Sequence, residues 1–338
     1  MFVSLARGMA RGKTAHRRLG LLALGVWLGL FAFNGLAWAQ PDADGFPRTV
    51  LVDGKPVTIP HKPVRIAALS GDVGDIVLEL VDLERIAAVP LHQDNPMMYR
   101  NHEKAAKVRG RLPGAADVDP EAVLAFDPDL IVLTLTHGAE LDALELLSLS
   151  GIPIVSIRSW SDFDGLMQNV LLIGEAVGEE EKAMAVVEKM RARLDAVEER
   201  LAGVEKPWAL PLSVISPDGT QPWLIGPTSF QYDLLVRAGA RYAGERLGVT
   251  RSIVASVEQL IQADPEYLLL TDWSGRGLDA YRDFLAHPGM QAVTAVEKGN
   301  VLILPYRELW HTLDAIEGLE KVAAWLHPDR FDETEGSP

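Results

Sequence analysis

Three histidines occupy positions from which imidazole could bind a metal ion. His92 and His137 each follow a buried apolar run, and His311 lies in a predicted last helix, Leu309–Leu326. Imidazole nitrogens are common ligands of zinc and related transition metals. No two of these histidines have a ligating helical spacing, and the chain has no clustered histidine tract. Direct metal binding through His92, His137 and His311 is therefore one alternative for this protein.

Aromatic and charged side chains gather in the loops that follow predicted strands. Flat indole and phenol rings suit a large or bulky ligand, and arginines suit acidic groups on it. These loops have the sequences SGDVG, PLHQDNPMMYR, TLTHGAE, RSW, IGPTSF, GVTRS, TDWSGRG and PYRELWH. The candidate ligand-binding residues are Asp72, His92, Tyr99, His137, Trp160, Trp223, Arg251, Trp273, Tyr306, Arg307 and Trp310.

Catalytic motifs are absent from the sequence. It contains no G-x-S-x-G elbow, no H-E-x-x-H zinc motif, no phosphate-binding G-x-x-x-x-G-K and no cysteine. A hydrolase with a pair of carboxylates stays as an alternative, because 47 acidic residues are present. We therefore predict a binding protein and not an enzyme.

Two similar segments each place a glutamate at the start of a helix. The sequences DPEAVLAFDPDLIVLT and SVEQLIQADPEYLLLT align without a gap, and Glu121 and Glu258 fall 137 residues apart. In each, the capping residue, Asp119 or Ser256, precedes the glutamate by two positions. An acid there suits the helix dipole, which is one sufficient reason for both glutamates. A period of this length indicates two similar lobes.

The N-terminal composition predicts export. Residues 1–39 contain five basic residues and no acid, followed by an apolar core and Ala37-Trp38-Ala39, which is typical of a secretory signal cut before Gln40. An uncleaved membrane anchor is the alternative. The remaining chain has 27 basic residues against 47 acidic ones, a net charge of −20, which argues against nucleic acid as a partner. Without cysteine, we expect neither a lipid anchor nor a thiolate metal site.

Strands and helices alternate along the chain. The pattern predicts an α/β fold with two similar lobes, each a mainly parallel sheet flanked by helices, joined by one long helix. The predicted parts are a signal peptide at 1–39, an N-terminal lobe at 40–178, the joining helix at 179–203, a C-terminal lobe at 204–330 and a polar tail at 331–338. Pro207 and Pro211 are expected to end the joining helix, with a strand at LSVIS after them.

Five motifs in this order resemble the helical-backbone (class III) periplasmic binding proteins of ABC importers for cobalamin, ferric siderophores and haem. The motifs are VTIPHKPVRIAAL, DPEAVLAFDPDLIVL, LSGIPIVSI, GPTSFQYDLLVRAGA and SVEQLIQADPEYLLL. The resemblance implies a soluble periplasmic monomer that holds a metal chelate, ferric siderophore or cobalamin-like, between two lobes. It also implies that Glu121 and Glu258 pair with arginines of the membrane permease, which works with an ATPase. No cofactor other than the bound iron or cobalt chelate is expected.

Haem is a second alternative among ligands of this kind. The NPMMY loop offers Met97, Met98 and Tyr99 as axial ligands. Many haem carriers that the chain resembles have a tyrosine shortly before the docking glutamate, and here that stretch reads LPGAADVDPE. The sequence therefore favours another chelate, without choosing among cobalamin, siderophores and related complexes.

Overall fold

The computed structural model describes residues 42, 44–113, 118–135, 138–213 and 222–331 of the 338-residue chain. The predicted signal peptide and nearly all of the predicted polar tail lie outside the described residues. Within these ranges, no helix is both long and apolar enough to cross a membrane.

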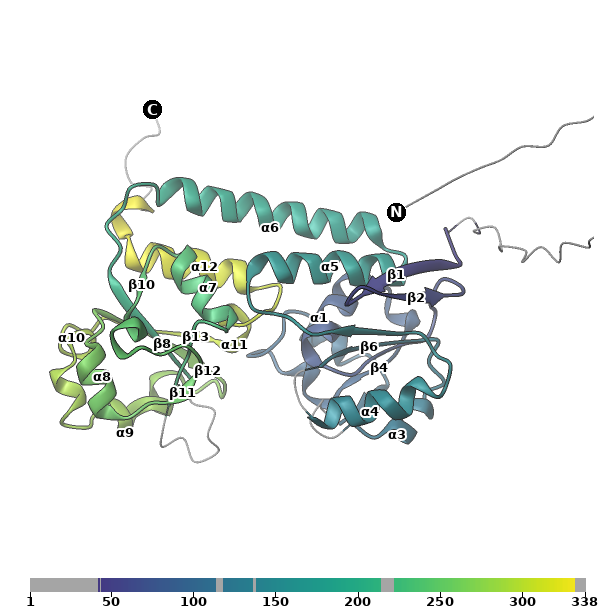
Figure 1. Cartoon of the computed structure of the whole chain (residues 1–338), viewed down its shortest axis with the longest axis horizontal. Helices are drawn as coiled ribbons and strands as arrows, with labels where there is room; N and C mark the ends of the chain where they lie inside the picture. The colour runs from purple at the N-terminus through teal and green to yellow at the C-terminus, as the bar shows by residue number, and fades with distance from the viewer. Residues whose placement is uncertain (1–41, 43, 114–117, 136–137, 214–221, 332–338) are drawn as a thin grey trace, which may run out of the picture. The chain divides into compact units, whose positions relative to one another are not determined.

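The first lobe is built on a five-stranded parallel sheet (Figure 1). Its strands are β3 (Ile66–Ala68), β4 (Ile86–Pro90), β5 (Gly110–Leu112), β6 (Leu130–Thr134) and β7 (Ile154–Ile157), in the order β5-β4-β3-β6-β7. The hairpin β1 (Arg48–Val52) and β2 (Lys55–Ile59) turns at Asp53-Gly54. The helices are α1 (Gly71–Leu80), α2 (His102–Ala105), α3 (Pro120–Leu124), α4 (Gly138–Ser148) and α5 (Phe163–Val177), with 3-10 turns at Leu83–Arg85 and Leu91–Asp94.

Both faces of this sheet are covered by helices. Leu130 and Val132 of β6 pack with the apolar residues of α1 and α5, whereas Ile131 and Leu133 pack with Val123 of α3 and Leu147 of α4. Alternate side chains of a strand point to opposite faces, so the fully apolar β6 needs a helical layer on each side. The structure therefore confirms the two-sided parallel sheet that the sequence predicts.

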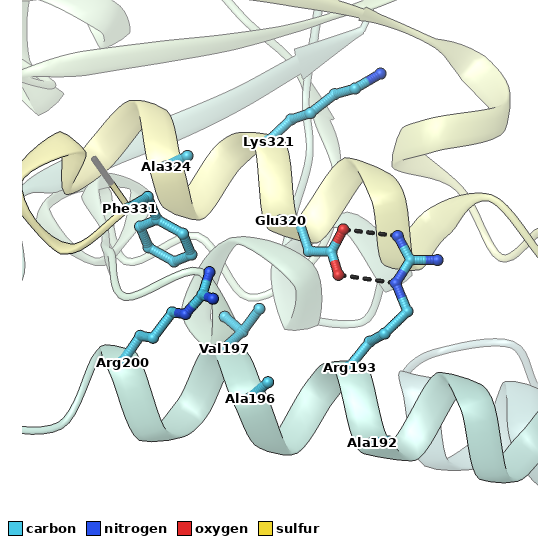
Figure 2. A pocket seen from close by; sticks show the side chains of 9 residues that line it. All are labelled: Ala192, Arg193, Ala196, Val197, Arg200, Glu320, Lys321, Ala324 and Phe331. Carbon is cyan, nitrogen blue, oxygen red and sulfur yellow. Dashed lines mark hydrogen bonds and ion pairs between the residues drawn. The ribbon is translucent and has the colours of Figure 1, made fainter. Parts of the chain in front are cut away.

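One long helix, α6 (Glu180–Arg200), connects the lobes. It follows α5 after Gly178, whose φ of 72° ends α5 in the left-handed conformation. Gly174 lets α5 and α6 approach closely, because a Cβ there would lie 2.3 Å from Cβ of Ala183. On the other side, α6 packs on α12 (Ala315–Leu326), and Arg193 donates to both carboxylate oxygens of Glu320 at 2.8 and 2.6 Å (Figure 2).

The second lobe holds a mixed sheet. Its strands are β8 (Trp208–Ser213), β9 (Trp223–Leu224), β10 (Arg241–Tyr242), β11 (Ile253–Val254), β12 (Tyr267–Asp272) and β13 (Val301–Pro305), in the order β11-β9-β8-β12-β13 with β10 also on β8. Pairing is parallel except around β9. Its other helices are α7 (Phe230–Arg237), α8 (Val257–Ala263), α9 (Arg282–Leu285), α10 (Thr294–Glu297) and α11 (Tyr306–Leu309), with 3-10 turns at Ala243–Leu247, Gly277–Tyr281, Met290–Ala292 and Pro328–Arg330.

The prediction that Pro211 lies before the first strand of this lobe is wrong. Pro211 lies inside β8, opposite Leu269 of β12. Its carbonyl accepts the N–H of Ile225, so its backbone nitrogen faces the same edge, away from β12. On that edge, β10 pairs only with Trp208 and Ala209, and β9 pairs from Leu212 onward. A proline is tolerated because the missing N–H falls between two short partner strands.

The prediction of one continuous last helix, Leu309–Leu326, is also wrong over its first third. Helix α11 ends at Leu309, and α12 begins at Ala315. Between them Trp310 is extended, with φ −108° and ψ 177°. The Thr312 hydroxyl donates to the carbonyl of Arg307 and accepts the N–H of Asp314 at 3.2 Å. These local hydrogen bonds compete with the helix and hold Trp310 and His311 in a loop.

The sequence repeat is also a structural repeat. Helices α3 and α8 each lead through an aspartate with positive φ, Asp127 at 50° and Asp264 at 37°, into strands β6 and β12. Two residues later, Asp129 and Glu266 each accept a backbone N–H at the start of the neighbouring strand, from Val64 and Trp208, both at 2.8 Å. Glu121 and Glu258 therefore occupy equivalent positions in two copies of one unit.

Candidate functional site

Aromatic rings from both lobes form one continuous cluster at the carboxyl ends of the strands. Ligands of such sheets bind at this edge. His92 is 5.8 Å from Tyr99, and Tyr99 is 6.4 Å from Tyr306 of the second lobe, measured between ring centroids. Tyr306 stacks on Trp310 at 5.1 Å, and Trp273 lies 4.4 Å from Tyr306. The cluster brings together five of the predicted ligand-binding residues.

His311 extends this cluster to the first lobe. Its ring stacks on Trp160 at 5.1 Å and lies 5.7 Å from Trp310. Its Nε2 is 3.3 Å from Oδ2 of Asp72, which lies in the first turn of α1, so the two lobes meet in a pair that is ionic when His311 is protonated. The Trp160 indole donates to Oγ1 of Thr134 at 3.2 Å, which fixes the ring at the end of β6.

Burial favours the neutral forms of Tyr99, Tyr306 and His92 in the cluster. It raises the pKa of the Tyr306 and Tyr99 phenols, and nearby acidic groups add to this effect. Burial lowers the pKa of His92, although Asp72 and Asp94 oppose it. Tyr99 fits only because residue 71 is glycine, since a Cβ there would lie 1.9 Å from the Tyr99 hydroxyl oxygen. The site is thus mostly neutral and aromatic.

A cavity of about 340 Å³ opens beside His311 and Trp310. Its lining combines aromatic rings with hydroxyl groups and comprises Arg158, Ser159, Trp160, Ser161, Thr228, Ser229, Phe230, Ser252, Trp310 and His311. Nε1 of Trp310 is buried and has no hydrogen-bond acceptor among the described residues. The loops RSW, IGPTSF and GVTRS are among those predicted to bind ligand, but the sequence does not single out Arg158, Phe230 and Ser252 within them.

Arg307 is engaged in contacts between the lobes. Its backbone N–H donates to the Met97 carbonyl at 3.1 Å, and its Nη1 donates to the Pro96 carbonyl at 2.5 Å. Its Nε lies 3.2 Å from Oδ2 of Asp314, an ion pair without hydrogen-bond geometry. Arg100 also pairs with Asp314. These contacts hold the loop that carries Tyr99 against the second lobe, and ligand binding by Arg307 stays a prediction.

Two other predicted ligand residues, Arg251 and Trp223, fall outside the cluster, and a third is not described. Arg251 is exposed, next to Ser252 of the cavity lining. Trp223 lies in β9, partly buried, opposite Ser213. His137 lies outside the described residues. Among the side chains that the structure does describe, no group of three or more His, Asp or Glu is arranged to hold a metal ion.

Asp75 lies one turn after Asp72 on α1 and is completely buried. Its Oδ1 accepts the N–H of Asn101 at 2.9 Å, and no described group hydrogen-bonds to Oδ2. Burial raises the pKa of Asp75 to about 6, with Asp314 adding to it and Arg100 opposing it. The folded state therefore takes up this proton more readily than the unfolded state does.

Replacing Asp75 by asparagine is expected to remove a pH-dependent part of the stability. Because the folded pKa is raised, the ionised carboxylate destabilises the fold above pH 6, and this penalty disappears as the pH falls to about 4. Relative to Asp75→Asn, the wild type should gain up to about 3 kcal/mol between pH 7.5 and pH 4. Urea unfolding of both proteins across this range measures it. A stability difference that does not change with pH would contradict the assignment.

Both predicted docking glutamates are exposed and begin helices. Glu121 and Glu258 are the second residues of α3 and α8. Hydrogen bonds from its own backbone N–H and from the Ser256 hydroxyl lower the pKa of Glu258, so this side chain is anionic at neutral pH. Their contact with a permease stays a prediction.

Comparison with known proteins settles the family. The family described as "Periplasmic binding protein" matches residues 66–308, which include both sheets. The chain belongs to this family. The family consists of solute-binding proteins, so the predicted binding class is confirmed at that level, and the fold class is confirmed with it.

One relative of this binding protein has a name that points to ABC transport, and another has a name that points to cobalamin. The "Uncharacterized ABC transporter substrate-binding lipoprotein YvrC" of Bacillus subtilis (strain 168) is 24% identical over 299 residues, covering 87% of this chain and 90% of its own. A "Cobalamin-binding protein" of Halobacterium salinarum is 25% identical over 248 residues, covering 73% of this chain and 64% of its own. The structure of Helicobacter pylori CeuE with Ni(II) bound matches with a TM-score of 0.71 at 19% identity, over 85% of this chain and 91% of that one, and shows the shared fold.

Proposed function

We propose that this binding protein captures a metal chelate, cobalamin-like or a ferric siderophore, and delivers it to an ABC permease in the membrane. The observation that carries the proposal is the aromatic cluster that spans the strand ends of both lobes and borders a cavity lined by aromatic rings and hydroxyl groups. Flat faces of Trp160 and Trp310 suit the apolar periphery of a large chelate. The hydroxyl groups of Ser159, Ser229 and Ser252 suit its amide or carbonyl edge.

The charge of the cavity favours a neutral chelate. Arg158 is the only cation in the cavity lining described, and it pairs with Asp53. A strongly anionic siderophore would leave its charge unpaired in such a site, which is unfavourable. Ligand pockets measure roughly 300–1,000 Å³. A cavity of about 340 Å³ lies at the small end of this range, so it would enclose only one edge of a large chelate. A corrinoid or a neutral ferric trihydroxamate therefore fits better than a ferric catecholate.

Haem and free metal ions are the alternative ligands. Tyr99 is buried with its hydroxyl against Gly71, and its raised pKa disfavours the phenolate that would bind haem iron. His311 and Asp72 approach each other, but the described residues offer no third ligand in a metal-binding arrangement. Both observations favour a metal chelate over haem or a free metal ion, because the chelate's own groups already coordinate its metal.

Intrinsic tryptophan fluorescence tests the ligand class. We expect saturable quenching by cyanocobalamin or by a neutral ferric trihydroxamate, because three tryptophans lie in the cluster. The metal-free trihydroxamate is the control, and haem and Ni²⁺ are titrated in parallel. The ligand should be recovered unchanged, as a binding protein makes no product. Quenching by haem or Ni²⁺ alone would contradict the chelate assignment.

The docking of the permease is the second part of the proposal. Two exposed glutamates at equivalent positions of a repeated unit suit a partner that offers two equivalent basic sites. Glu121 and Glu258 would pair there with permease arginines, and ligand would pass from the cleft to the membrane channel.

A further inference from the structure

Each repeated glutamate has an exposed aliphatic neighbour on its own helix. Leu124 follows Glu121 by three residues in α3 and is 38% exposed, and Ile261 follows Glu258 by three residues in α8 and is 41% exposed. Residues three apart lie on the same face of a helix, with Cβ atoms about 5–6 Å apart. The two lobes therefore present the same pair, an acid beside an aliphatic side chain.

These aliphatic residues lie outside the apolar cores of the lobes. Val123 and Leu260, at 1% and 0% exposure, anchor α3 and α8 to the apolar cores. Leu124 and Ile261 belong to neither core in the part of the chain that the structure describes. A single exposed leucine is ordinary on a protein surface. Here an exposed aliphatic side chain occurs at the equivalent position of both copies, although the surrounding sequences differ. This recurrence indicates a role at the surface.

We propose that Glu121 with Leu124, and Glu258 with Ile261, form two composite contacts for the permease, each fitting a basic side chain beside an apolar surface. This inference rests on the proposed docking role of the glutamates. Two equivalent contacts require a partner with two equivalent sites, such as a two-fold symmetric pair of permease subunits.

The aliphatic side chain has a physical task in such a contact. When it packs against the partner, it excludes water from the neighbouring pair of charges. A desolvated charge pair is stronger and less screened by salt than an exposed one. Apolar contacts that surround a buried anchor act in the same way at other protein interfaces. The aliphatic residue thus increases affinity directly and also protects the ion pair.

Docking to the cognate permease–ATPase complex in nanodiscs, measured at 50 and 500 mM NaCl, tests the proposal. The variants are Leu124→Ser with Ile261→Ser, and Glu121→Gln with Glu258→Gln. Leu51→Ser is the matched control, since Leu51 is a 65% exposed leucine of β1 outside the repeat. Thermal unfolding checks that every variant is folded.

We expect the double serine variant to dock about 30- to 100-fold more weakly and with a steeper salt dependence, because its ion pairs become hydrated. The double glutamine variant should dock weakly with little salt dependence. If the serine variant docks like wild type while the glutamine variant fails, the composite contact is wrong and docking by glutamates stands. If neither variant loses affinity, both proposals are wrong. An equal loss in Leu51→Ser would also overturn the inference.

Discussion

Replacing Trp310 by alanine should weaken binding of the chelate by about 30- to 1,000-fold, the loss expected for a central aromatic anchor of about 2–4 kcal/mol. Trp310 contacts Tyr306, Trp273 and His311 and lines the cavity. Its removal takes away the ring that connects the two halves of the cluster. Fluorescence or calorimetric titration with cyanocobalamin and a neutral ferric trihydroxamate measures the effect.

Two further variants separate the causes of that loss. Trp310→Phe keeps an aromatic ring of smaller area in the cluster, so its loss should be only about five- to tenfold. Trp325→Phe is the control, because Trp325 packs on Tyr267 away from the cavity lining. Wild-type affinity in a folded Trp310→Ala protein would show that the ligand lies elsewhere.

The sequence predicts the fold well because its signals are local. Capping residues locate the starts of α3 and α8, and the joining helix predicted at 179–203 agrees with α6 to within three residues at each end. The gapless repeat predicts equivalent lobes, and the structure adds the left-handed Asp127 and Asp264 and the matching hydrogen bonds of Asp129 and Glu266.

Hydrogen bonds and close packing decide the features that the sequence pattern does not show. Periodicity continues through Trp310–Asp314, but Thr312 breaks the helix by bonding to backbone of its own segment. Gly318 then lets α12 pass the carbonyl of Glu308, since a Cβ there would lie 1.7 Å from that oxygen. Pro211 is accepted in a strand only because of where its short neighbours end. No residue pattern in the sequence predicts the break between α11 and α12 or the proline inside β8.

The sequence predicts which loops form the candidate site, but it predicts only some of the residues within those loops that lie in the aromatic cluster. Strand ends indicate which loops meet, so Asp72, Tyr99, Trp160 and Trp310 could be named in advance. Whether an arginine in such a loop faces a ligand depends on its neighbours. Arg307 lies beside Asp314 and the carbonyls of Pro96 and Met97, so it connects the lobes. Composition carries no information on that choice.

Charge reversal at the two repeated glutamates is expected to abolish transport while sparing ligand binding. An arginine at position 121 or 258 would face a basic partner with like charge, and stranding a partner charge in an interface lowers affinity by about 30-fold or more at each site. Both positions are exposed and neither belongs to the cavity lining, so folding and ligand affinity should change little.

The double variant Glu121→Arg with Glu258→Arg distinguishes a docking role from a purely helical one. If the glutamates only complement helix dipoles, their neutralisation to glutamine would lower stability slightly and leave transport normal. If they dock, each single reversal should reduce uptake, and the double reversal should remove it, because the two sites share one partner and the second contact gains from the first. Uptake, permease docking and chelate affinity are measured on the same four proteins. Normal uptake by the double variant would end the docking hypothesis, whereas lost uptake with intact chelate affinity would place the defect at the membrane surface.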